Sequence, residues 1–209
     1  MADRFITCPS CGAPHEIYNP GLAMFVCEYC DNAVYWDEGR IQDAGKQAVL
    51  PEGFTRLYRG ATGSLFQRRF CVLGRARYSY GEGFWDEWYL EMHDGSVEWL
   101  TEDDGELSLQ KQIDTPKDFS SRSPKVGAWL AVGDERFVVE EVGTAKCIGV
   151  EGDLPKVVTI GEEYRYADAS SPDGRYNLSV EYDDTPPTLF RGHWLKYAAM
   201  RLDDEGDDW

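Results

Sequence analysis

The amino-acid sequence predicts a mainly β protein with a small separate module at its N-terminus. Short apolar runs rich in β-forming residues alternate with glycine-containing turns over most of the 209 residues. Helical periodicity is weak, and the one modest candidate, residues 194–202, could equally continue a strand. Four cysteines in paired spacing precede this β-rich region. We therefore expect two kinds of folding unit in one chain.

The paired cysteines predict a metal site. Cys8, Cys11, Cys27 and Cys30 form the pattern C-x2-C-x15-C-x2-C. Each C-x-x-C knuckle directs two sulfurs at one point, so two knuckles place four thiolates around one Zn²⁺. A redox dithiol is usually a single pair, and iron is the other metal that suits four sulfur ligands. The spacing predicts a zinc ribbon over residues 1–35.

The ligand set also predicts what the metal does. Four thiolates leave no open position for water or substrate, so the Zn²⁺ is expected to be structural. The ribbon is too short to bury much core, and the metal should supply its folding free energy. His15 lies between the two knuckles and could replace a cysteine, but with four cysteines in register it is expected at the surface.

Composition narrows the partners and the compartment. The formal net charge of −17 opposes nucleic-acid binding, because phosphate contacts need a basic face. Nucleic-acid binding would require Arg68, Arg69, Arg75 and Arg77 to lie together on one face. Alternating arginines such as Arg75 and Arg77 are more typical of a solvated strand face. Six cysteines, four in metal spacing, favour a reducing cytoplasm. The two others, in apolar runs, are expected to be buried free thiols: Cys71 and Cys147.

No apolar run in the sequence approaches the length of a membrane helix, so no membrane insertion is expected. The first residues also lack the apolar core of a signal peptide.

Turn residues and weak internal similarity predict the organisation of the rest. Asp94-Gly95 separates two β-rich runs, a strong signal for a hairpin. The stretch from Glu87 to Asp104 has echoes between Glu163 and Asp184, which predicts two small, repeated, barrel-like units of about five strands each. The expected boundaries are a linker over 36–49, a first unit over 50–113, a linker over 114–124, a second unit over 125–202 and an acidic tail over 203–209.

Several motifs together resemble a known family. They are the leading cysteine quartet, Phe70-Cys-Val-Leu-Gly-Arg-Ala-Arg-Tyr78, Trp85-Asp-Glu-Trp-Tyr-Leu90 and Leu189-Phe-Arg-Gly-His-Trp-Leu195. From Cys8 to about Leu202 the chain is similar to the bacterial domain-of-unknown-function family numbered 4178. The resemblance implies no activity and no catalytic residues. It implies an accessory protein that acts with partners, in settings linked to membrane stress or to polyamine synthesis.

An aromatic cluster is the strongest candidate for ligand contact. Trp88 and Trp99 are expected in the core, where aromatic rings contribute large buried areas. Phe84 and Trp85 follow a Gly-Glu-Gly loop, and the acidic Glu82 and Asp86 beside them would favour a basic or polyamine-like ligand. Asp86 and Glu87 should face opposite sides of their strand.

The sequence contains no recognisable catalytic constellation. Its three histidines lie in different segments, and its one Gly-rich stretch lacks the lysine of a phosphate loop. We therefore expect a non-enzymatic adaptor for a protein partner. The alternative is a small-ligand binding or catalytic module that uses a cleft between the two units.

Overall fold

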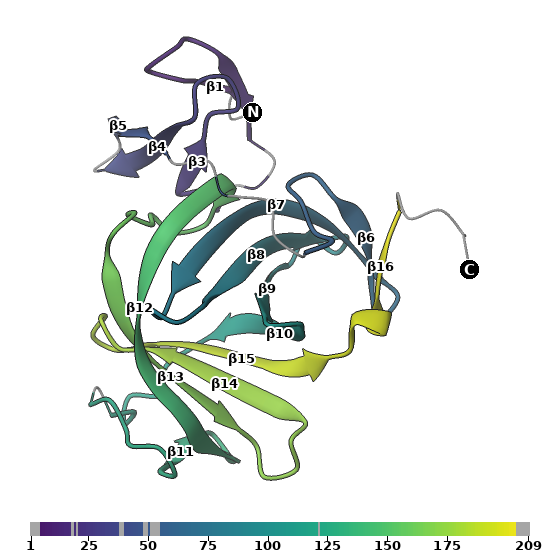
Figure 1. Ribbon diagram of the computed structural model, residues 1–209, viewed down its shortest axis with the longest axis vertical. Coiled ribbons are helices and arrows are strands. Elements are labelled where there is room, and N and C mark those ends of the chain that lie inside the picture. The colour runs from purple at the N-terminus through teal and green to yellow at the C-terminus, as the bar shows by residue number, and fades with distance from the viewer. Residues whose placement is uncertain are drawn as a thin grey trace.

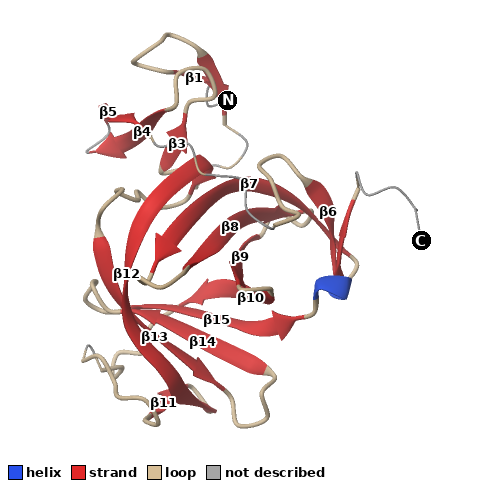
Figure 2. Cartoon of the chain, in the orientation of Figure 1, coloured by secondary structure: helices blue, strands red, loops and turns tan. Residues whose placement is uncertain are grey.

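The fold is almost entirely β (Figures 1 and 2). In this computed structural model the described residues are 5–17, 19, 21–37, 40–47, 50, 55–120 and 122–203. Within those ranges the one helical element is a three-residue 3-10 turn, η1 (Tyr197–Ala199). In the same ranges no helix has the length and apolar character needed to cross a membrane. The predicted mainly β class is confirmed.

The N-terminal ribbon consists of two short sheets. Strands β1 (Phe5–Thr7) and β2 (Pro14–Glu16) form a hairpin around the first knuckle. Strands β3 (Met24–Val26), β4 (Asn32–Asp37) and β5 (Arg40–Lys46) pair in order around the second knuckle. The expected linker over 36–49 is thus partly strand, since β5 completes the ribbon sheet.

Eight strands close into one antiparallel barrel. The first half of the chain supplies β7 (Arg68–Ser79), β8 (Phe84–Met92), β9 (Val97–Asp103) and β10 (Glu106–Ile113). The second half supplies β12 (Glu135–Leu154), β13 (Glu163–Ser170), β14 (Tyr176–Glu181) and β15 (Thr188–Leu195). Neighbours along the chain pair within each half, β10 pairs with β15, and β7 pairs with β12. The predicted Asp94-Gly95 hairpin joins β8 to β9, with Gly95 at a φ of 78°.

The predicted pair of separate barrel-like units is not confirmed. Each half forms a four-stranded meander whose outer edges would be unpaired alone, and exposed edges favour pairing with another strand. The two meanders satisfy each other's edges at the β10–β15 and β7–β12 seams. Gly192 permits close approach at the first seam, because a Cβ there would lie 2.0 Å from the Leu109 carbonyl oxygen.

Small additional elements cover the outer faces of both meanders. Strands β6 (Thr62–Leu65) and β16 (Met200–Leu202) pair with each other and pack beside Trp88, which is fully buried as predicted. Residues 194–202 therefore contain the end of β15, η1 and β16 rather than a helix. Strand β11 (Trp129–Val132) and the segment before it cover the second meander. The expected linker 114–124 lies between β10 and β11.

The ribbon closes one end of the barrel (Figure 1). Strand β12 extends past the barrel and pairs with β3 through Asp153 and Leu154. Met24 and Val26 then join the same buried cluster as Trp85 and Trp99 of the barrel interior. The ribbon is therefore continuous with the barrel core. At the other terminus Asp203 binds Arg69, and residues 204–209 of the predicted acidic tail lie outside the described residues.

Candidate functional site

The four ribbon cysteines converge on one point. Their sulfurs all lie within 4.8 Å of one another, and none forms a disulfide. The Sγ atoms of Cys8 and Cys30 are 3.8 Å apart, and those of Cys11 and Cys27 are 3.7 Å apart. Four sulfurs at about 2.3 Å from a tetrahedral Zn²⁺ would be separated by about 3.8 Å. The quartet therefore fits a metal ion with four thiolate ligands.

The expected surface position of His15 is wrong. Its side chain is buried, stacks on Phe25 at a centroid distance of 3.9 Å and places Nε2 3.0 Å from Asp153 Oδ1. The ring is thus used at the junction between ribbon and barrel, where an imidazole can contact both an aromatic face and a carboxylate. It is not one of the residues grouped at the metal site.

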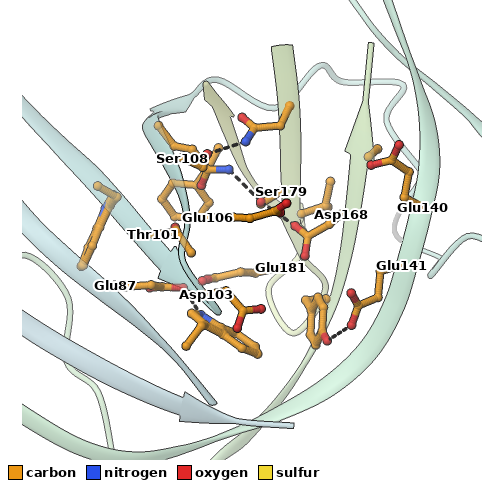
Figure 3. Close-up of a pocket in the computed structure, with 18 of the residues that line it drawn as sticks. Glu87, Thr101, Asp103, Glu106, Ser108, Glu140, Glu141, Asp168, Ser179 and Glu181 are labelled. Atoms are coloured by element: carbon orange, nitrogen blue, oxygen red, sulfur yellow. Dashed lines mark hydrogen bonds between the residues drawn. The ribbon is translucent and has the colours of Figure 1, made fainter. Parts of the chain in front are cut away.

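The barrel encloses a cavity of about 370 Å³ (Figure 3). A barrel of about eight strands has an interior wide enough for packed side chains or one small ligand. Seven carboxylates from both meanders line it: Glu87, Asp103, Glu106, Glu140, Glu141, Asp168 and Glu181. Seven aromatic rings share the wall: Tyr80, Trp85, Trp99, Tyr164, Tyr166, Phe190 and Trp194. None of the described residues that line it is a lysine or an arginine.

Burial shifts the pKa of several of these carboxyl groups upward. It raises the pKa of Glu87 to about 7, an effect that Lys156 opposes and Glu181 reinforces. Figure 3 shows Glu87 and Glu181 pointing toward each other across the cavity. Burial also raises the pKa of Asp168 to about 6, although the Ser179 hydroxyl donates a 2.6 Å hydrogen bond to it. The cavity therefore gains negative charge as the pH rises through neutrality.

A β-bulge adds two carboxylates at one side of the cavity. The register of β12 against β13 shifts between Val139 and Glu141, so Glu140 and Glu141 both reach the lining instead of alternating. Glu140 accepts a 2.6 Å hydrogen bond from the Ser170 hydroxyl, and Glu141 accepts one of 2.5 Å from the Tyr166 hydroxyl. Both glutamates are exposed, which places them where the cavity meets solvent.

Two polar atoms in the cavity lack a protein partner. Asn177 Oδ1 and Asp103 Oδ1 are buried and accept no hydrogen bond. The amide nitrogen of Asn177 is used, since it donates to the Ser108 hydroxyl. Both unpartnered atoms are acceptors, so a molecule that satisfies them must be a hydrogen-bond donor.

The structure separates the four residues predicted to contact a ligand. Trp85 lines the cavity, and its indole nitrogen donates to Glu87. Asp86 lies on the opposite face of β8, as alternation predicts, buried between Arg75 and Arg77. Phe84 is exposed on that outer face, under the Arg77 guanidinium, and Glu82 lies in the exposed loop before β8. The structure therefore does not bring these four residues onto one surface, and their contact with a ligand stays a prediction.

The arginines considered for nucleic-acid binding are paired with carboxylates. Arg75 and Arg77 both bind Asp86 and are buried, which corrects the expectation of a solvated face. Arg68 binds Asp94 and Glu98, while Arg69 binds Asp203. Their charges are therefore largely neutralised within the fold.

The two remaining cysteines are free thiols, as expected, and no disulfide joins them. Cys147 is buried in the barrel interior, whereas Cys71 is partly buried.

Sequence reasoning missed most of the cavity. Glu87, Thr101 and Asp103 alternate with outward residues on β8 and β9, and the same pattern recurs on β13 and β14. Polar, acidic and aromatic side chains at alternate positions of these strands, with one acid on each, were the available signal. It could not be used without knowing that both meanders face one interior.

Comparison with known proteins places the barrel in a family. The family described as Domain of unknown function (DUF4178) matches residues 59–197, which includes the whole barrel and leaves out the ribbon. No curated protein and no solved structure matches the chain. Because the matched segment spans most of the sequence, the chain belongs to the DUF4178 family.

Proposed function

We propose that the barrel binds a small organic cation, such as an amine. The observation that carries this proposal is the lining of the cavity: seven carboxylates, seven aromatic rings and, among the described lining residues, no cationic side chain. The cavity volume of about 370 Å³ lies within the range of small-molecule sites.

Electrostatics supports a cationic ligand. Carboxylates that share a low-dielectric cavity repel one another, so an incoming positive charge gains attraction from several at once. The raised pKa values of Glu87 and Asp168 are consistent with this repulsion and with burial. An anionic ligand would be repelled by the same carboxylates.

Hydrogen bonding and ring chemistry support the same class. An ammonium group offers three donors, and the carboxylates that line the cavity are acceptors. Trp85, Trp99 and Trp194 offer π faces, which attract cations within about 6 Å of the ring centre.

We also propose that the ribbon cysteines hold one structural Zn²⁺. The all-thiolate set and its closed arrangement support zinc, with iron as the competing metal. When bound, the metal would supply folding free energy to the ribbon.

We retain the adaptor role, with a protein partner and a cytoplasmic location, as a separate prediction. Its support is the charge and the cysteine usage of the sequence rather than any described surface.

Tryptophan fluorescence tests the cation proposal. Three of the cavity rings are tryptophans, so a ligand there should alter their emission. We expect spermidine to change the emission with a Kd below millimolar in the native protein, and expect at least a tenfold weaker Kd in a Glu87→Gln/Asp168→Asn variant. The exposed Asp183→Asn substitution is the matched control and should leave Kd unchanged. No change in emission below millimolar spermidine would show that the proposal is wrong.

A further inference from the structure

A lysine already places its ammonium group against one end of the cavity. Lys156 follows β12 in the loop 155–162, and its Nζ lies 2.7 Å from Glu181 Oε1. The same nitrogen is 5.9 Å from the ring centroid of Trp99 and 5.8 Å from that of Phe190. Glu181 and both rings line the cavity. One carboxylate and two aromatic faces around a primary ammonium form the kind of cage that recognises amines.

Charge keeps this ammonium in place. Burial opposes a charged Lys156, but the carboxylates of Glu181 and Glu87 outweigh burial and raise its pKa. The side chain is 34% exposed, whereas its ammonium group is held against Glu181 by a 2.7 Å ion pair. Lys156 therefore stays cationic at neutral pH and balances the acids at this end.

The other end of the cavity has acids without such a lysine. Asp168 faces Ser179 across the β13–β14 pairing, and Ser179 is two residues from Glu181 on β14. Two residues of strand span about 7 Å. Along the strands, Asp168 therefore lies roughly that distance from Glu181 and from the Lys156 ammonium that contacts it. Glu141 pairs with Asp168 across β12 and β13, and burial and the charges of Asp103, Glu140 and Glu141 raise the pKa of Asp168, so further carboxylates lie near it. The cavity thus has an inner ammonium position, which is filled, and an outer acidic region.

We propose that Lys156 is a specificity-determining residue: it occupies an inner ammonium subsite and confines ligand amines to the outer acids. This inference rests on the proposed cation binding. A diamine whose nitrogens are about 7 Å apart could contact both Asp168 and Glu181 only by displacing the lysine ammonium. The native protein should therefore bind a diamine only slightly more tightly than a monoamine. The carboxylate and rings around the Lys156 ammonium would bind a second amino group if the lysine were absent.

Amines of matched length test the inference. Titration calorimetry at about pH 8, where the cavity acids are ionised, would compare putrescine with n-butylamine on the native chain, Lys156→Ala and Lys156→Arg. We expect the ratio of putrescine to n-butylamine affinity to be at least tenfold higher in Lys156→Ala than in the native protein. Lys156→Arg keeps the cation and should keep the native ratio. An equal ratio in all three proteins would overturn the proposal.

Chemical rescue provides a second measurement that does not depend on the outer acids. Lys156→Ala leaves Glu181 without its ammonium, so ethylammonium chloride should raise the Tm of this variant more than sodium chloride at equal concentration. The native protein should show no such difference. Absence of rescue in a folded Lys156→Ala protein would show that no inner ammonium subsite exists. Failure of native protein to bind spermidine, with rescue intact, would instead refute the outer-site proposal.

Discussion

His15 Nε2 lies 3.0 Å from Asp153 Oδ1, and this buried contact joins the four-cysteine ribbon to the strand that closes the barrel. Asp153 also pairs with Phe25 through the backbone, and Phe25 stacks on His15. The ribbon and the barrel are thus joined by backbone pairing and a polar contact at one place, and ring stacking inside the ribbon holds His15 there.

Replacing Asp153 should weaken this junction. Asp153→Ala removes the buried carboxylate that lies 3.0 Å from the His15 ring, a contact at ion-pair distance without hydrogen-bond geometry, and should lower the free energy of unfolding by about 1 kcal/mol. Urea denaturation, followed by tryptophan fluorescence, measures the loss. Glu163→Ala, at an exposed acid that has no side-chain partner among the described residues, should change stability by less than about 0.5 kcal/mol. Equal effects of the two substitutions would contradict a role for the contact.

Metal loss should unfold the ribbon and disturb the part of the barrel interior that packs against it. We expect one equivalent of zinc by elemental analysis and unfolding of residues 5–35 in Cys8→Ser or Cys27→Ser, because the metal supplies the ribbon's stability. Since Met24 shares a buried cluster with Trp85, tryptophan emission should change too. Cys71→Ser removes a cysteine outside the quartet and is the control. A metal-free ribbon with native amide exchange would contradict this account.

Stability should fall as the pH rises toward 8. The folded pKa of Glu87, about 7, exceeds its ordinary value of 4.5. The folded state therefore holds this proton more tightly, and its contribution is complete below about pH 4.5 and lost as the pH rises through 7. The expected loss is about 3 kcal/mol, because each pKa unit corresponds to about 1.4 kcal/mol. Urea denaturation at several pH values should show that the free energy of unfolding falls less steeply with pH in Glu87→Gln than in the exposed control Glu163→Gln. An equal pH dependence in the two variants would refute the assignment.

Affinity for a cation should change in the opposite direction. Deprotonation of Asp168, with a pKa of about 6, and then of Glu87 adds negative charge to the cavity. The Kd for spermidine should therefore decrease at least tenfold between about pH 5 and about pH 8. The Glu87→Gln/Asp168→Asn variant should show a flatter profile. A native Kd that is independent of pH would mean that these carboxylates do not contact the ligand.

The cluster of Asp86 with Arg75 and Arg77 should be a major contributor to stability. Asp86→Ala leaves two buried guanidinium groups without their shared carboxylate, and breaking a buried ion pair costs about 3–5 kcal/mol. The exposed pair of Arg175 and Asp173 is the comparison, and Arg175→Ala should cost at most about 1 kcal/mol. Chemical denaturation of both variants measures the difference, and similar losses would be inconsistent with burial of the cluster.

The sequence supported predictions that depend on local spacing. The cysteine quartet, the Asp94-Gly95 hairpin and the opposite orientation of Asp86 and Glu87 follow from residues that are near one another. Burial of Trp88 followed from its large apolar area.

Long-range pairing lay beyond the sequence. Nothing local distinguishes two small sheets from two meanders that close on each other, and the seams join β10 to β15 and β7 to β12. The burial of His15 depends on Asp153, far along the chain, and the buried arginines depend on Asp86. The cavity is assembled from both halves, so its lining could not be predicted from either.

The β7–β12 seam has a consequence for how the protein folds. It joins residues 74–79 to residues 146–152, so closing it brings together segments separated by most of a meander and its connections. Contacts this distant in sequence require a large loop-closure entropy before they contribute, and they slow folding. Each meander can form from neighbouring hairpins, yet neither encloses a volume. The cavity therefore comes into existence only when both seams have formed, and a ligand that fills it should slow unfolding rather than accelerate folding.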